Sequence, residues 1–202
     1  MRLRFLPAVA AAALLLTLAA CGSNKSSSTA ASSASGTTAM AAVAEPNDAD
    51  VVFAQSMIAH HEQAVEMSTM ALDAKAAASA SVKDLATRIK AAQDPEITQM
   101  TAWLTMHNKP TTMTSSGGHD MAGMNGTTGM MSVEDMTALG KKTGKDFDAS
   151  WLKMMIDHHT GAIAMAQTVK TSGNDAEMRA LADKIITAQQ KEITEMKTLV
   201  AA

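Results

Sequence analysis

The sequence has 202 residues, 18 of them methionine and only one of them cysteine, with a formal net charge of −3. The single cysteine excludes an intrachain disulfide, and the acidic balance argues against nucleic acid as a partner and against a polybasic membrane patch. No nucleophile–base pair, phosphate-binding loop or cofactor fingerprint is present, so we expect a binding protein rather than an enzyme. No motif points to a particular protein partner.

The first 20 residues are predicted to be a signal peptide. Arg2 and Arg4 form a short basic start, and the apolar run from Phe5 to Leu18 is shorter than the roughly 20 residues of a membrane span. The following Leu18-Ala19-Ala20-Cys21 resembles a bacterial lipobox, which implies cleavage before Cys21 and lipidation of its thiol. The alternative is an ordinary signal peptide with an incidental cysteine. Without Arg2 and Arg4 the chain has 15 basic and 20 acidic residues, a net charge of −5.

The lipobox predicts an exported protein, lipid-anchored to the outer face of the bacterial cytoplasmic membrane or in the periplasm. Residues 21–46 are predicted to be the lipidated cysteine and a flexible tether, because Ser23 to Ala39 is rich in Ser, Ala and Thr and nearly uncharged. Residues 47–200 are predicted to be one helical domain, with a hairpin over 47–107, a Met- and Gly-rich loop over 108–131 and a hairpin over 132–200.

The apolar residues of this domain recur with the period of a helix, and no stretch has the alternation of a strand. We therefore expect an all-α fold, an antiparallel four-helix bundle of two pseudo-symmetric hairpins. Capping residues set the boundaries, including Asp50 after Asn47 and Asp84 after Ser81, and Pro95 predicts a kink in the second helix. In chain order, the expected helices run from Asn47 to about Lys75, from Ser81 to about His107, over 132–139, from Asp146 to about Lys170, and from Asp175 to about Leu199.

One motif occurs twice: Met57-Ile58-Ala59-His60-His61 returns as Met155-Ile156-Asp157-His158-His159. In a helix the methionine lies three and four residues before the two histidines, so all three share a face. Thioether and imidazole together suit Cu(I), and Ag(I) by the same softness, better than Mg or Ca. Neighbouring helical residues diverge by ~100°, so further ligands must come from another helix. The alternative is that each histidine is a core residue hydrogen-bonded to a neighbour.

Two carboxylates, Glu96 and Glu192, lie on the apolar stripes of the second and fourth long helices. A buried carboxylate needs a partner, and the histidines of the preceding helix are available. Two interpretations remain open: each glutamate orients an imidazole toward a metal, or it forms a core ion pair that fixes the helix register. A di-iron centre is excluded, because no glutamate lies three residues before a histidine.

The loop over 108–131 carries methionine and histidine without helical periodicity, where methionine has no packing role. Together with the end of the second helix, it is similar to the Met/His motifs of exported copper-handling proteins. The alternative is a low-complexity linker. The predicted accessory metal residues are His107, Met113, His119, Met121, Met124, Met130 and Met131.

Both motif copies, M-I-A-H-H-E-Q-A-V-E-M and M-M-I-D-H-H-T-G-A-I-A-M, resemble the domain-of-unknown-function family 305, over about Asn47 to Leu199. The resemblance implies an exported, ferritin-like four-helix protein. Copper-binding members of the family imply a role in sequestering copper, and in some cases silver, outside the cytoplasm. By matching motif, the metal ligands would be Met57, His60, His61, Met67, Met155, His158, His159 and Met165.

We therefore expect a lipid-anchored, extracytoplasmic protein that binds copper, as Cu(I), and acts as a metal buffer or chaperone in copper tolerance. Two alternatives belong to other classes. One is a ferritin-like, metal-dependent oxidase that uses a His/Glu site. The other is a structural or interaction bundle with a His–Glu core and no metal.

Overall fold

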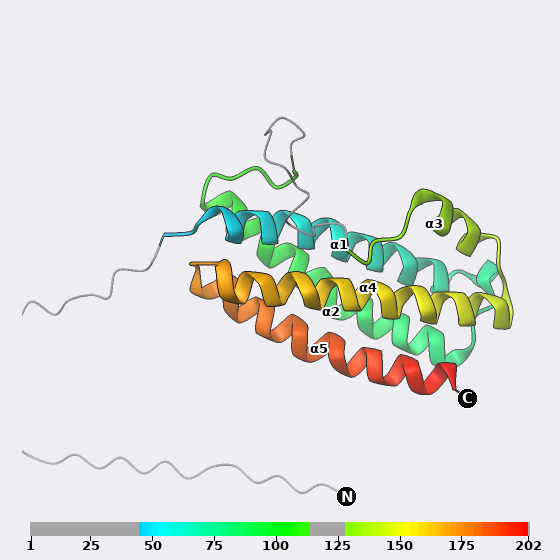
Figure 1. Ribbon diagram of the computed structural model, residues 1–202. Coiled ribbons are helices and arrows are strands. Elements are labelled where there is room, and N and C mark those ends of the chain that lie inside the picture. Colours follow the sequence, from blue (N-terminus) through cyan, green and yellow to red (C-terminus); the bar gives the residue numbers. More distant parts are fainter. Residues whose placement is uncertain (1–44, 114–127, 202) are drawn as a thin grey trace, which may run out of the picture. The chain divides into compact units, whose positions relative to one another are not determined.

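The structure is a computed structural model that describes residues 45–113 and 128–201. Four long helices lie side by side, with neighbours antiparallel: α1 (Asp48–Leu72), α2 (Ala80–Met106), α4 (Gly144–Ser172) and α5 (Ala176–Val200) (Figure 1). The 3-10 turn η1 (Ala74–Ala76) joins α1 to α2, and the short α3 (Val133–Gly140) lies over one end of α1 and α4. No strand occurs in these two ranges, and the expected all-α, antiparallel four-helix bundle is confirmed.

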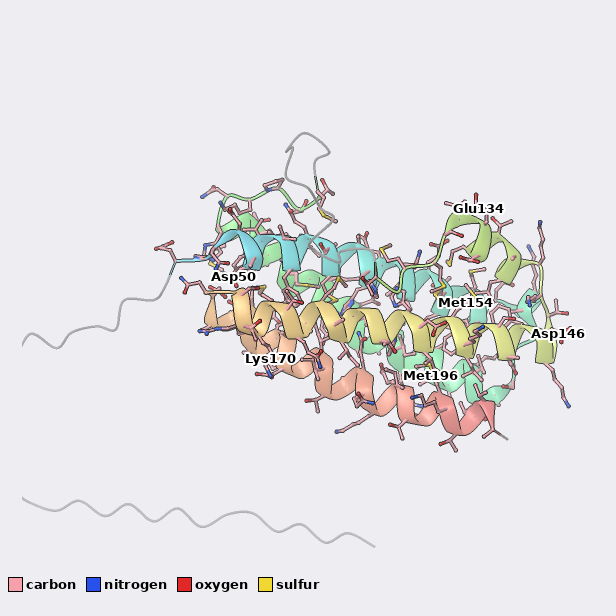
Figure 2. All side chains as sticks on the ribbon, in the orientation of Figure 1. Asp50, Glu134, Asp146, Met154, Lys170 and Met196 are labelled. Carbon is pink, nitrogen blue, oxygen red and sulfur yellow. The ribbon has the colours of Figure 1, made fainter. Side chains whose placement is uncertain are left out.

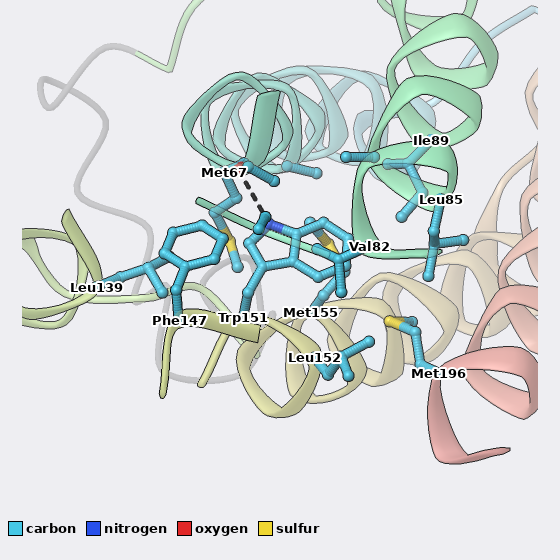
Figure 3. Packing of buried hydrophobic residues seen from close by; sticks show 14 of the residues in the cluster. Met67, Val82, Leu85, Ile89, Leu139, Phe147, Trp151, Leu152, Met155 and Met196 are labelled. Carbon is cyan, nitrogen blue, oxygen red and sulfur yellow. Dashed lines mark hydrogen bonds between the residues drawn. The ribbon is translucent and has the colours of Figure 1, made fainter. Parts of the chain in front are cut away.

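Buried polar residues divide the interior of the bundle into two apolar cores. The first core joins the C-terminal half of α1 to the beginning of α4 (Figure 3), and the indole N–H of Trp151 donates a hydrogen bond of 2.9 Å to the carbonyl oxygen of Met67. The second core joins the beginning of α1 to the C-terminal half of α4 and includes Phe53, Trp103 and Ile185. Between the cores lies a polar layer, at most 2% exposed, consisting of His60, His61, Gln93, His158, His159 and Gln189.

The two hairpins, α1–α2 and α4–α5, hold each other through equivalent carboxylates. Asp50 of α1 is fully buried, and its Oδ2 accepts the backbone N–H groups of Asn174 (2.9 Å) and Asp175 (3.0 Å), where α5 begins (Figure 2). Asp148 of α4 accepts the backbone N–H of Ser79 at 3.2 Å, where α2 begins. The start of the second helix in each hairpin is therefore held by the first helix of the other hairpin.

The prediction that Ser81 begins α2 is wrong. The N-cap is Ser79, whose side chain accepts the N–H of Val82, and the helix begins at Ala80. The N–H of Ser79 itself is bound by Asp148, an interaction across the bundle that no local pattern reveals. α2 then continues as one helix through Pro95. The kink expected at that proline stays a prediction.

Two other boundaries differ from the expected ones. α4 begins at Gly144 with Thr143 as its N-cap, so Asp146 lies in the first turn and is not the cap. α1 ends at Leu72, shortly before the predicted end, because Asp73 adopts an extended conformation and caps η1 instead. The remaining helix starts agree with the prediction, with N-caps at Asn47, Ser132 and Asp175.

Among the described helices, none combines the length and the apolarity that a membrane crossing requires. The predicted signal peptide, Cys21 and most of the tether lie outside the described residues.

Replacing Asp50 with Ala is expected to lower the free energy of unfolding by on the order of 3 kcal/mol, because three backbone N–H groups lose a buried, charged acceptor. Asp148→Ala is the matched variant, at the equivalent half-buried position. It removes the acceptor of one N–H group and should cost on the order of 1 kcal/mol. Urea unfolding followed by circular dichroism measures both losses. Equal losses would contradict the larger role given to Asp50.

Candidate metal centre

The four histidines of the repeated motif lie at the centre of the polar layer, all with 0% exposure. His60 of α1 and His158 of α4 face each other across the seam between these helices, with ring centroids 3.7 Å apart and ring planes inclined by 43°. The neighbouring rings of His158 and His159 have centroids 6.3 Å apart. The structure therefore pairs one histidine from each copy of the motif, and it turns the other two toward α2 and α5.

His61 and His159 each contact the glutamate on the next long helix. Nε2 of His61 lies 2.8 Å from Oε2 of Glu96, and Nε2 of His159 lies 2.8 Å from Oε2 of Glu192. The two glutamate side chains are 19% and 13% exposed, so they stand between the polar layer and solvent. Each glutamate has the partner that the sequence predicts, and the two contacts are equivalent in the two hairpins.

His60 has an oxygen partner of a different kind. Its Nε2 lies 3.1 Å from the backbone carbonyl oxygen of Thr128, in the segment that leads to α3. This segment crosses α4 in backbone contact: a Cβ on Gly161 would collide with the Thr128 carbonyl group, and a Cβ on Gly129 would lie 2.7 Å from the Asp157 carbonyl oxygen. Gly129 also has a φ of +83°. Only glycine fits both positions, and the pair fixes the carbonyl group beside His60.

Sequence reasoning singled out neither Thr128 nor the two glycines. The signal available was the Thr-Gly that follows the second histidine pair, His158-His159-Thr160-Gly161, where a helix-interior glycine is unfavourable unless something packs closely against it. The repeat obscures this signal, because the first copy has Glu62 and Gln63 at the equivalent positions.

Three of the four imidazoles thus donate Nε2–H to an oxygen, because a carbonyl or carboxylate oxygen accepts. Their other nitrogen, Nδ1, has no hydrogen-bond partner within the described residues, and neither nitrogen of His158 has one. A buried polar atom without a partner costs about 1–3 kcal/mol. Imidazoles that bind a metal typically donate the opposite N–H to a carboxylate or a backbone carbonyl. Glu96, Glu192 and Thr128 supply these acceptors.

His60 and His158 are held in the neutral form. Burial lowers the pKa of His60 to about 4, and the hydrogen bond to Thr128 only partly opposes this, while His61 and His159 add a smaller lowering. Burial also lowers the pKa of His158 well below its ordinary value, and the other three histidines lower it further. The neutral imidazole is the form that binds a metal ion.

Thioethers lie on both sides of the polar layer. Met57 and Met165 belong to the second core, and Met67 and Met155 belong to the first core. All four side chains are at most 7% exposed. The sequence places Met57 and Met67 on one face of one helix, whereas the structure places them in different cores. Each is grouped with a methionine of α4, so either side of the layer offers two thioethers.

No three side chains of His, Cys, Asp or Glu surround a common metal position within residues 45–113 and 128–201. As the side chains stand, a site in the polar layer therefore combines no more than two imidazoles with thioethers from a flanking core. Such a donor set is soft and has few ligands. It suits Cu(I) or Ag(I), and it does not suit the hard cations that need six or more oxygen ligands.

The accessory residues within the described ranges lie at separate places. His107 is the C-cap of α2, and Met113 accepts a hydrogen bond from the Ser56 hydroxyl at 3.7 Å. The backbone of Met131 exchanges hydrogen bonds of 2.7 and 2.9 Å with the Gln63 side chain of α1. Met130 is half-buried, whereas His119, Met121 and Met124 lie outside the described residues.

The apo bundle is expected to lose stability as the pH falls from about 6.5 to about 4. His60 has a pKa of about 4 in the folded protein against 6.5 ordinarily, so the unfolded chain binds more protons within this window. The contribution of neutral His60 to the free energy of unfolding is complete above pH 6.5 and is lost below pH 4. Its loss lowers this free energy by about 3 kcal/mol. Urea midpoints across this pH range measure it. His60→Gln/His158→Gln should flatten the pH dependence, and an unchanged slope would assign it to other groups.

Comparison with known proteins identifies the fold family. Residues 50–200 match the family model described as "Domain of unknown function (DUF305)". A DUF305 protein of Streptomyces coelicolor is 32% identical, with a TM-score of 0.69 over 76% of this chain and 92% of that one. A DUF305 fragment from Deinococcus radiodurans is 28% identical, with a TM-score of 0.65 over 77% of this chain and 97% of that one.

CopM in its Cu(I)-bound form is 32% identical to this chain, with a TM-score of 0.60 over 74% of this chain and 94% of CopM. CopM structures also exist in Cu(II)-bound, Ag-bound and apo forms. No curated protein sequence matches the chain. The match to the family model covers most of the chain, including α2, α4, α5 and all but the first two residues of α1. The chain therefore belongs to the DUF305 family.

Proposed function

We propose that this protein binds copper outside the cytoplasm, as Cu(I), and acts as a lipid-anchored metal buffer or chaperone rather than as an enzyme. The observation that carries the proposal is the polar layer. Its buried imidazoles point N–H groups at oxygens, and their other nitrogens have no partner in the part of the chain that the structure describes. Thioethers flank the layer on both sides. The similarity to CopM, which has been solved with Cu(I), Cu(II) and Ag bound, supports copper as the metal.

His60 and His158 are the proposed nitrogen ligands. Their rings are in contact, both are neutral, and His60 can offer Nδ1 while Thr128 holds its Nε2–H. The remaining ligands would be the thioethers of one flanking core, either Met57 with Met165 or Met67 with Met155. Two imidazole nitrogens and two thioether sulfurs together form a soft donor set with few ligands, which Cu(I) prefers.

Glu96 and Glu192 have an electrostatic role in this proposal. An ion of charge +1 in a dry core needs compensating negative charge nearby. The two carboxylates stand at the edge of the polar layer, each bound to a histidine adjacent in sequence to a proposed ligand. Their partial exposure keeps them hydrated, which lowers the cost of holding the charge there.

Burial of the site suits storage of Cu(I) rather than turnover. The four imidazoles have no exposed surface, and the methionines have almost none. A dry site limits the access of water and other co-reactants to the ion. Export is supported by the signal-peptide-like start and by the Streptomyces coelicolor relative, which is described as a candidate secreted protein.

The double variant His60→Gln/His158→Gln tests the site. The apo protein should stay within about 1 kcal/mol of wild type, because among residues 45–113 and 128–201 His158 has no hydrogen-bond partner to lose and His60 has one. Wild type should gain stability with Cu(I), by ~4 kcal/mol at ~1,000-fold the dissociation constant, and the variant should lose most of this gain. Thermal unfolding with and without Cu(I), under anaerobic reducing conditions, measures both quantities.

The matched control is His61→Gln/His159→Gln, which breaks the two contacts with glutamate. Its apo stability should fall further than that of the first variant, while most of the Cu(I)-induced gain remains. A wild type whose melting temperature ignores Cu(I), or a first variant that keeps the full gain, would refute a copper site in the polar layer.

The lipid anchor is tested by Cys21→Ser. Because Cys21 ends the lipobox-like run, the variant should leave the membrane fraction or remain unprocessed at its precursor length. Cell fractionation followed by immunoblotting measures location and length together. A variant that stays in the membrane fraction at the mature length would show that Cys21 is not the anchor.

A further inference from the structure

A groove between α1 and α3, outside the polar layer, is lined by three methionines. Met70 comes from α1, Met131 from the segment before α3, and Met136 from α3, and they line a hollow of about 440 Å³ together with Gln63 and Glu66. All three methionines are half-buried and pack against the outside of the first core. Unlike the methionines of the cores, they lie where an ion from solution can reach them.

The backbone around the groove is held by specific contacts. The N–H of Met131 donates to Oε1 of Gln63 at 2.7 Å, and its carbonyl oxygen accepts from Nε2 of Gln63 at 2.9 Å. α3 is docked by Leu139, which is 1% exposed in the first core. The side chain of Met70, on α1, packs closely against Gly140 at the end of α3: its methyl carbon lies 3.2 Å from the position that a Cβ on Gly140 would take. The three methionines therefore line the groove from elements that specific contacts hold in place.

The chemistry of the groove selects a soft cation. Glu66 is the one ionisable side chain among the described residues that line it, so the groove favours positive charge. Thioethers bind soft metal ions and are poor ligands for Mg or Ca. Packing alone does not call for sulfur here, because leucine has similar volume and Leu139 already anchors α3. We infer that this groove binds one soft monovalent cation, Cu(I) or Ag(I), through Met70, Met131 and Met136.

This site shares no residue with the polar layer, and it stands whether or not the layer binds copper. Its position at the surface also differs from the full burial of the four histidines. An ion in the groove exchanges with solution without any opening of the bundle. The protein would then hold one exchangeable ion in the groove and one buried ion in the polar layer.

The experiment is a silver titration followed by NMR of methionine methyl groups labelled with ¹³C. The mature protein carries Cys21→Ser throughout, so that its single thiol does not bind silver. The methyl resonances of Met70, Met131 and Met136 should shift together and follow one saturable binding curve as Ag(I) is added. Met70→Leu/Met136→Leu should bind one equivalent less, as measured by equilibrium dialysis.

Met154→Leu is the matched control. Met154, on α4 (Figure 2), is half-buried and packs against the same core but does not line the groove. This variant should bind as much silver as the parent protein. Circular dichroism checks that the leucine variants fold, and the shifts of the parent protein decide the question even if one variant does not.

Three results would overturn the inference: silver shifts that spare the three methyl groups, equal silver binding by the double variant and the control, or loss of the groove shifts in His60→Gln/His158→Gln. The last result would show that the two sites are one. Retention of the groove shifts in that variant supports a separate site, even if the polar layer binds no copper.

Discussion

Six polar side chains buried across the middle of a helical bundle impose a cost that the surrounding residues must offset. Glu96 and Glu192 accept from two of the imidazoles, and the carbonyl of Thr128 accepts from a third. The amides of Gln93 and Gln189 and several ring nitrogens have no partner within the described residues. The two apolar cores lie on either side of these groups and hold them away from water. The glycine contact, the glutamate pairs and the order of the cores along each helix all depend on this layer.

The two interpretations of the histidines apply to different members of the set. A core hydrogen-bonding role accounts for His61 and His159, each of which has a glutamate partner at 2.8 Å. It does not account for His158, which has no partner at either nitrogen within the described residues. His60 has an oxygen partner only at Nε2 within these residues, and its ring contacts that of His158. Stability alone would favour apolar side chains at these two positions. Their chemistry is that of a ligand pair, and the neighbouring thioethers have the matching softness.

Helical periodicity and capping were sufficient to predict the number, type and approximate extent of the helices, as well as the pairing of each motif with a glutamate. Features that depend on contacts between helices could not be predicted from the sequence. Ser81 with Asp84 has the pattern of a cap, yet Asp148 binds the N–H of Ser79 and moves the helix start. The facing of His60 and His158, and the grouping of Met57 with Met165, depend on how α1 and α4 are aligned along their lengths. No pattern within one helix contains that alignment.

The crossed carboxylate contacts have a consequence for how the chain folds. The start of α5 is complete only when Asp50 is beside it, and the start of α2 only when Asp148 is beside it. A folding intermediate with a single formed hairpin would leave its own carboxylate without these backbone donors, and the N–H groups at the start of its second helix without this acceptor. Such an intermediate lacks the hydrogen bonds that join the two hairpins and is disfavoured relative to the full bundle. The two similar halves are therefore energetically one cooperative unit, and the repeat in the sequence does not correspond to two modules that fold independently.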